Sequence, residues 1–243
     1  MKYIFTLLTQ IVILQQNVIK PLLNTSELFN QIFSGIKAVI FDLDGTLIDS
    51  TPAWERANDL FFAKHGLTHG SDYFQNLTGK TLQQCAQYIQ QTFSPHLSPH
   101  LIISDLEFFY DRELSSVAFF PFSLSLIRTL INKNFKLGIA SACTARWFSQ
   151  LISFQSPQDQ LLLQKITFVS CDETCSKPDP MVYTECMRRL GVEPFETVVF
   201  EDSGTGLSGA RQSGARVVHA MCSQVSERAD FGFRGYHEFG IEE

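Results

Sequence analysis

Carboxylates follow two of the apolar runs in this 243-residue chain, at positions where they could share a cation. Asp42 and Asp44 come directly after the first run, and Glu201 and Asp202 come after a later one. Carboxylates that converge on one crevice repel one another unless a divalent cation lies among them. Because every ligand offered is an oxygen, Mg²⁺ is favoured over zinc. The pattern therefore predicts a magnesium site.

A serine and a lysine occupy comparable positions. Ser141 ends another apolar run, and Lys177 lies in the loop after the next one. A compact positive charge and a hydroxyl beside a cation suit a dianionic group with three oxygens, so phosphoryl transfer is the expected reaction class. Asp42 and Asp44 are two residues apart and can face the same side. One of these carboxylates can attack phosphorus while the other moves a proton, and Thr46 can add a donor near the phosphate.

Five strand-like apolar runs must position these residues, and stretches with helical spacing separate the runs. This alternation predicts an α/β fold with a doubly wound parallel sheet, in which ligands bind at the carboxyl ends of the strands. The runs cover residues 37–41, 136–141, 165–170, 197–200 and 216–220.

Residues 51–119 interrupt the alternation because they hold no convincing strand. Helical spacing within them predicts helices near 54–65, 82–92 and 101–114. We expect an all-helical insertion, hinged near 49–52 and 119–122. The α/β core domain then comprises residues 37–50 and 120–243. Residues 1–36 form an N-terminal extension of unknown role, and its apolar stretch 3–14 predicts an accessory helix or strand that docks on the core.

Composition narrows the choice of partners. Lys and Arg number 19 against 25 Asp and Glu, a net charge of −6, so no basic excess is available to bind nucleic acid. The stretch 3–14 is too short to span a membrane and no cleavage site follows it, which favours a cytoplasmic protein with no membrane span over an exported one. A monomer is favoured, although composition does not fix the oligomeric state.

Four strings resemble, in order, the motifs of the haloacid dehalogenase-like hydrolase superfamily. They are FDLDGTLIDS (41–50), IASAC (139–143), SKPDP (176–180) and FEDSGTG (200–206). The chain looks most like the branch with a helical cap inserted after the first motif. That branch includes sugar phosphatases, phosphoglycolate phosphatases and β-phosphoglucomutases, and the stretches 47–57 and 177–194 look most like hexose-phosphate phosphatases.

The resemblance implies a role for each motif residue. Asp42 would be the nucleophile that forms an aspartyl phosphate, and Asp44 would be the acid to the leaving alcohol and then the base to water. Ser141 would hydrogen-bond the phosphoryl oxygens, and Lys177 would neutralise the charge of the transition state. Mg²⁺ would be held by Asp42, the carbonyl of Asp44, and Asp202. Glu201 would reach the metal directly or through water.

The resemblance also implies substrate contacts and leaves the reaction partly open. Gly79 and Lys80 look like the cap loop that reaches over the substrate, while Leu82 stands where mutases usually have arginine. Ala142 stands beside the motif serine in place of a frequent asparagine. We expect a Mg²⁺-dependent phosphatase whose partner is a small phosphorylated metabolite, a sugar phosphate. A β-phosphoglucomutase-like phosphomutase and a non-catalytic binding or regulatory member of the fold are the alternatives.

Overall fold

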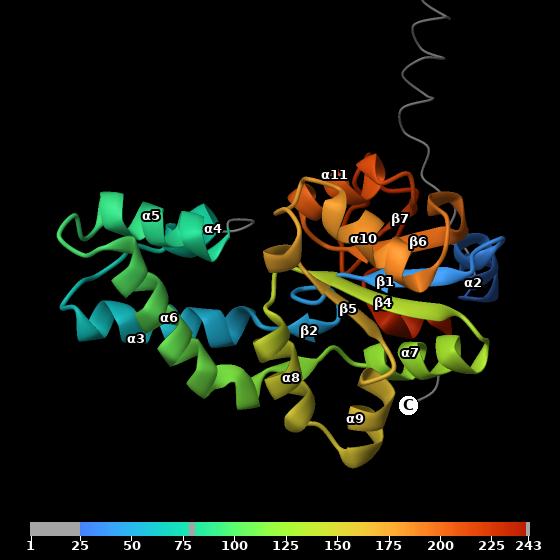
Figure 1. The fold of residues 1–243 in the computed structure, drawn as a ribbon, viewed down its shortest axis with the longest axis horizontal. Coiled ribbons are helices and arrows are strands. Elements are labelled where there is room, and N and C mark those ends of the chain that lie inside the picture. The colour runs from blue at the N-terminus through green and yellow to red at the C-terminus, as the bar shows by residue number, and fades with distance from the viewer. Residues whose placement is uncertain (1–24, 78–80, 242–243) are drawn as a thin grey trace, which may run out of the picture.

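A six-stranded parallel sheet forms the centre of the molecule in a computed structural model that describes residues 25–77 and 81–241. The strand order is β5-β4-β1-β6-β7-β8, so the first strand of the sheet lies between strands from distant parts of the sequence (Figure 1). The predicted doubly wound parallel sheet is confirmed. The strands are β1 (Ala38–Phe41), β4 (Lys136–Ser141), β5 (Thr167–Ser170), β6 (Thr197–Glu201), β7 (Arg216–His219) and β8 (Phe231–Gly232).

The registers bring the carboxyl ends of the central strands to one edge of the sheet. Phe41, the last residue of β1, lies opposite Ile139 of β4 and Phe200 of β6. Ser141 lies opposite Ser170, so β4 and β5 also end together. Polar residues that follow these strands are thereby collected along one edge, as expected for a ligand site in an open parallel sheet.

Helices cover both faces of the sheet, which explains why β1 is apolar throughout. Ala38 and Ile40 pack on one side with α10 and α11, whereas Val39 and Phe41 pack on the other with α7 and α8. The two helical layers lie above and below the sheet in Figure 1. The helices of the core are α7 (Ser123–Asn132), α8 (Ala145–Ser153), α9 (Pro157–Leu163), α10 (Met181–Leu190) and α11 (Gly204–Gln212), with short 3₁₀ turns at η2 (Cys171–Glu173) and η3 (Pro194–Glu196).

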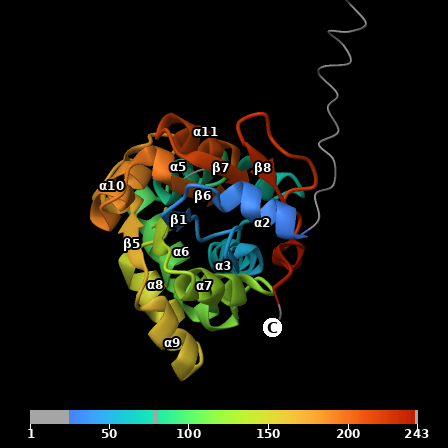
Figure 2. The same ribbon diagram turned by 90° about the vertical axis from the view of Figure 1, so that its right-hand side faces the viewer.

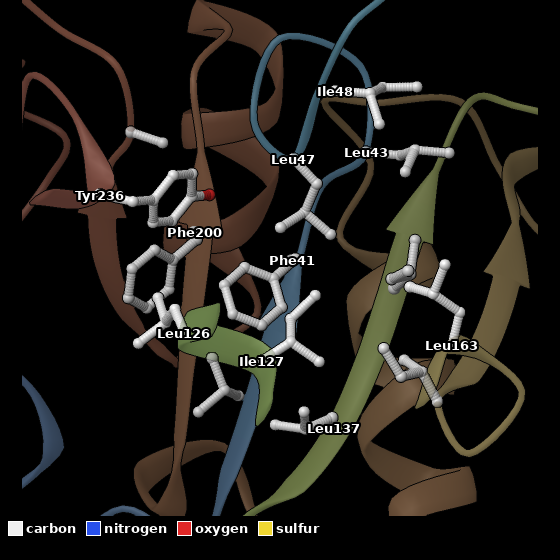
Figure 3. Packing of buried hydrophobic residues seen from close by; sticks show 14 of the residues in the cluster. Phe41, Leu43, Leu47, Ile48, Leu126, Ile127, Leu137, Leu163, Phe200 and Tyr236 are labelled. Atoms are coloured by element: carbon white, nitrogen blue, oxygen red, sulfur yellow. The ribbon is translucent and has the colours of Figure 1, made fainter. Parts of the chain in front are cut away.

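Segments near both ends of the described chain close the Phe41 side of the core. They are α2 (Thr25–Phe33) and η4 (Tyr236–Phe239), which lie near each other in Figure 2. The ring of Phe33 lies 6.1 Å from that of Phe200, and Figure 3 shows Tyr236 packed beside Phe200 and Phe41. Arg216 donates to the carbonyl oxygen of Ile32 at 2.5 Å and so caps the end of α2. Residues 25–36 therefore dock on the core, whereas the stretch 3–14 lies outside the described residues.

The segment between the first two core strands is helical, and a two-stranded ribbon joins it to the core. In this ribbon β2 (Ile48–Asp49) runs antiparallel to β3 (Ala118–Phe119). The predicted hinge regions therefore lie side by side. The helices pack around their own apolar cluster, which includes Phe61, Phe62 and Ile102, to one side of the sheet (Figure 1). They are α3 (Thr51–Lys64), α4 (Tyr73–Leu77), α5 (Leu82–Thr92), α6 (Pro99–Glu113) and the 3₁₀ turn η1 (Leu114–Ser116).

The longer helices of the insertion agree with the sequence pattern, whereas the short elements of the insertion and of the core were missed. Helix α5 has the predicted bounds because Thr81 and Gln84 form a capping box at its start. Helix α4 has five residues and β2, β3 and β8 have two each, too few for a periodic pattern to develop. No helix within 25–77 or 81–241 combines the length and apolar character needed to span a membrane.

Candidate active site

The predicted polar residues meet at the carboxyl edge of the sheet. Asp42 directly follows β1, Ser141 ends β4, and Glu201 ends β6. Asp202 comes next in the chain, and Lys177 enters from the loop between β5 and α10. Asp42, Ser141 and Glu201 are buried, and the other two are partly buried. Residues up to 160 positions apart are thereby gathered around one site.

Lys177 joins two of the carboxylates. Its Nζ donates to Oδ1 of Asp42 and, at 2.6 Å, to Oε1 of Glu201. Only 9% of the Lys177 side chain is exposed, so these ion pairs are shielded from water. Burial works to lower the pKa of Lys177, but the charges of Asp42 and Glu201 overcome it and raise that pKa well above its usual value. The lysine therefore holds its charge beside Asp42.

Glu201 is held by donors on both carboxylate oxygens. Oε1 accepts from Lys177 and, at 3.1 Å, from the hydroxyl of Tyr183. Oε2 accepts from the backbone N–H of Ser203 at 2.8 Å and from its hydroxyl at 3.0 Å. A Cβ at Gly206 would lie 1.8 Å from Oε1, so helix α11 approaches this carboxylate as closely as glycine permits. The arrangement fixes Glu201 beside the lysine.

Asp202 is packed against the loop that follows β1. The Thr46 hydroxyl donates to Oδ1 of Asp202 at 3.1 Å, and the Thr46 side chain is completely buried. Gly45 has a φ of +82°, and a Cβ there would lie 2.4 Å from Oδ2 of Asp202. Glycine is required for both reasons. The hydroxyl of Thr46 thus faces Asp202, and the predicted contact of Thr46 with the phosphate, through its hydroxyl or its backbone, stays a prediction.

Asp44 has a different set of partners. The Ser141 hydroxyl lies 3.5 Å from Oδ2 of Asp44, and Ser141 Oγ itself accepts from the backbone N–H of Cys143 at 2.9 Å. The side chain of Ser50 also hydrogen-bonds Asp44, and it is a hydrogen-bond partner of Tyr110 on α6. Asp44 is therefore linked to the helical insertion and is separate from the carboxylates that the lysine joins.

Burial makes ionisation of the clustered carboxylates unfavourable. It raises the pKa of Asp42 well above its usual value, with Lys177 opposing the shift, and it also raises the pKa of Asp44. Burial and the charge of Glu201 together raise the pKa of Asp202 to about 7. With Glu201 the site holds four carboxylates, and Lys177 is paired with only two of them, Asp42 and Glu201.

The geometry and chemistry of this cluster suit a divalent cation. Carboxylate oxygens of Asp42, Glu201 and Asp202 lie within 4.8 Å of one another. All three offer oxygen, the donor that hard cations prefer, and a cation would offset the repulsion that raises the pKa of Asp202. Glu201 already accepts hydrogen bonds on both oxygens. Asp42 and Asp202 are therefore the better placed ligands.

Sequence comparison identifies the family. A family model described as haloacid dehalogenase-like hydrolase matches residues 39–220, most of the chain and all of the residues described above at the sheet edge. The chain belongs to this family. Membership of the haloacid dehalogenase-like hydrolases confirms the resemblance that the four sequence motifs carried, and it makes the protein an enzyme of the hydrolase class.

Named relatives of this haloacid dehalogenase-like hydrolase include phosphatases. Validoxylamine A 7'-phosphate phosphatase from Streptomyces hygroscopicus subsp. limoneus is 24% identical over 178 residues, 73% of this chain and 82% of that protein. Fructose-1-phosphate phosphatase YqaB from Escherichia coli (strain K12) is 25% identical over 182 residues, 74% of this chain and 94% of that protein. CbbY from Rhodobacter sphaeroides, solved in complex with phosphate, has the same fold, with a TM-score of 0.73 and 23% identity over 84% of this chain and 96% of that chain.

The remaining sequence predictions concern substrate contacts. Ala142 is exposed and directly follows Ser141 at the edge of the site. Gly79 and Lys80 lie outside the described residues. Sequence reasoning did not single out four further residues that shape the hydrolase site. Ser50 and Ser203 lie inside recognisable motifs, where their hydroxyls could have drawn attention. Tyr110 and Tyr183 sit among apolar helix residues and carry no such signal.

Proposed function

We propose that this haloacid dehalogenase-like hydrolase is a Mg²⁺-dependent phosphatase that hydrolyses a small phosphomonoester, a sugar phosphate, through an aspartyl phosphate on Asp42. The different surroundings of Asp42 and Asp44, two residues apart in the chain, support this most directly. Asp42 shares Lys177 and the cation cluster, whereas Asp44 faces Ser141 and Ser50. One carboxylate is thus equipped as a nucleophile and the other as a proton carrier.

The first step transfers the phosphoryl group to the protein. A carboxylate oxygen of Asp42 attacks phosphorus, and the bond from phosphorus to the sugar oxygen breaks. The raised pKa of Asp44 favours its protonated form, which gives its proton to the departing oxygen. Lys177, already paired with Asp42, offsets the charge that develops on the phosphoryl oxygens. Ser141 donates to one of those oxygens.

The second step releases phosphate. Asp44, now ionised, takes a proton from water, and the resulting nucleophile attacks the phosphorus of the aspartyl phosphate. The bond from phosphorus to Asp42 breaks and regenerates its carboxylate. Mg²⁺, held by Asp42, Asp202 and the backbone carbonyl of Asp44, with Glu201 directly or through water, would supply charge neutralisation of the phosphoryl group.

We propose that the helical insertion selects the substrate. Residues 51–119 would act as a cap that covers the site and excludes water, with Gly79 and Lys80 contacting the substrate from above. Thr46 and Ala142 line the core side, Thr46 through its backbone. The fructose 1-phosphate named for the Escherichia coli relative supports a sugar phosphate as substrate. A cytoplasmic location and a monomeric state stay predictions.

A panel of phosphomonoesters tests the proposal. The purified chain is incubated with Mg²⁺ and hexose, pentose and glycolate phosphates, including β-glucose 1-phosphate, and ³¹P NMR follows the products. Inorganic phosphate from one or a few sugar phosphates, lost in Asp42→Asn and in EDTA, supports the phosphatase. A new sugar phosphate without phosphate release identifies a phosphomutase. No turnover of any member of the panel contradicts the proposal and favours a binding role.

A further inference from the structure

Asp202 is held from two directions by residues beyond the sequence motifs. On the side-chain path, the buried hydroxyl of Tyr236 donates to the backbone carbonyl of Thr46 at 2.9 Å. The hydroxyl of Thr46 in turn donates to Oδ1 of Asp202 at 3.1 Å. Tyr236 is 1% exposed, so water does not compete for its hydroxyl. Tyr236, in the C-terminal turn η4, is therefore linked to Asp202 by two hydrogen bonds through Thr46.

On the backbone path, His219 holds the main chain of the same residue. Nδ1 of His219 accepts from the backbone N–H of Ser226 at 3.0 Å, which requires Nδ1 to be unprotonated. The proton of the neutral ring is then on Nε2, which lies 3.2 Å from the carbonyl oxygen of Asp202 and donates to it. The ring is thus fixed in one tautomer and one orientation, with Asp202 on one side and the 221–230 loop on the other.

Both paths begin in the C-terminal segment. Tyr236 and Ser226 lie after residue 220, where the match to the family model ends. Tyr236 is itself held by ring contacts, with its ring centroid 4.9 Å from Phe233 and 6.3 Å from Phe239. The C-terminal segment is therefore packed against the loop that carries Thr46.

We propose that Tyr236 and His219 are positioning residues that set the orientation of Asp202 as a metal ligand, and so tune the affinity of the site for Mg²⁺. This inference rests on the proposed function, because it takes Asp202 as a ligand. Carboxylate ligands bind best when partners in the outer shell fix their angle, and loss of such a partner typically costs about 10- to 100-fold in metal affinity. Neither residue touches the reacting atoms, so the effect falls on metal binding.

The test is isothermal titration of the full-length chain with Mg²⁺. Tyr236→Phe removes one hydroxyl and keeps the ring, and His219→Leu removes the donor to the Asp202 carbonyl. We expect each variant to bind Mg²⁺ about 10-fold more weakly or worse, and the apparent Mg²⁺ constant of turnover to rise in parallel while kcat at saturating Mg²⁺ changes less. Tyr73→Phe is the matched control, because it removes another buried tyrosine hydroxyl, one that donates to Asn58 in the helical insertion.

The outcomes separate this inference from the proposed function. Wild-type affinity in both Tyr236→Phe and His219→Leu contradicts the positioning role while leaving the phosphatase intact. A wild-type protein that binds no Mg²⁺, or whose Mg²⁺ affinity is unchanged by Asp202→Asn, contradicts the metal site and the inference with it. Circular dichroism and the melting temperature without Mg²⁺ report folding. If His219→Leu does not fold, the result for Tyr236→Phe decides.

Discussion

The ammonium of Lys177 lies 2.6 Å from Oε1 of Glu201, and both groups are shielded from water. Hydrogen bonds from Tyr183 and Ser203 fix the carboxylate of Glu201. Because Glu201 is fixed, it holds the ammonium of Lys177 next to Asp42. A buried ammonium that loses one of its two carboxylate partners loses part of the charge compensation that offsets burial, and it loses a contact that fixes its position. Glu201 thus serves mainly to position Lys177, whereas its neighbour Asp202 is the proposed metal ligand.

Replacement of Glu201 by Gln tests whether Glu201 and Asp202 have these different roles. We expect Glu201→Gln to lower kcat by roughly 10- to 100-fold, because Lys177 loses an ionic partner, and to change Mg²⁺ affinity less than Asp202→Asn does. Steady-state kinetics and titration calorimetry on the two variants measure both effects. A larger loss of Mg²⁺ affinity in Glu201→Gln than in Asp202→Asn would instead make Glu201 the principal ligand.

Because α11 lies so close to Glu201, we expect one added methyl group, in Gly206→Ala, to lower both stability and activity. Alanine stabilises a helix by about 1 kcal/mol relative to glycine, yet the Cβ of Gly206→Ala would meet Glu201 at 1.8 Å. We expect a net destabilisation of about 1–3 kcal/mol and a loss of activity, because the carboxylate must move. Urea unfolding measures the change. Gly204→Ala is the control, since no atom lies within 4 Å of its Cβ, and equal destabilisation in both variants would contradict the explanation.

The raised pKa of Asp202 predicts how pH changes the response to Mg²⁺. This pKa is about 7 in the folded protein against an ordinary 3.8, so the metal-free fold binds a proton more tightly than the unfolded chain does. The resulting stabilisation is fully present below about pH 4 and is lost as pH rises through about 7. Mg²⁺ binds the ionised carboxylate. The increase in melting temperature caused by Mg²⁺ should therefore be larger at about pH 8 than at about pH 6, and Asp202→Asn should reduce this difference.

Most of the core and the clustered site could be predicted because their signals are local. The run 37–41 is apolar since β1 is covered on both faces, and Asp42 follows it directly. What the sequence could not show is which partner each polar atom meets. The hydrogen bond from Tyr236 to the Thr46 carbonyl joins residues 190 positions apart, and nothing in either neighbourhood indicates it. For the same reason the sequence did not show that the hydroxyl of Thr46 faces Asp202.

The contacts of Asp111 predict that the packing of α6 against α8 contributes to stability and to substrate binding. Its Oδ1 accepts from the indole N–H of Trp147 at 2.6 Å, and its carboxylate also accepts from Arg146. The rings of Trp54 and Tyr110 stack on each other at this junction, 3.8 Å apart. We expect Asp111→Ala to cost about 1 kcal/mol, because Arg146 is half exposed, and to raise KM a few-fold by loosening the proposed cap. An unchanged KM would show that this junction does not affect substrate binding.

The covalent intermediate on Asp42 is the central claim, and Asp44→Asn gives direct access to it. The substrate is acetyl phosphate with Mg²⁺, because its leaving group departs without a proton from Asp44. We expect this variant to accumulate one phosphoryl group per chain by intact mass, mapped to Asp42 by peptide analysis, with turnover reduced about 10²- to 10⁴-fold. The double variant Asp42→Asn, Asp44→Asn should remain unmodified. Phosphate release by Asp42→Asn, or an Asp44→Asn protein that turns over at the wild-type rate and carries no phosphoryl group, would contradict the mechanism.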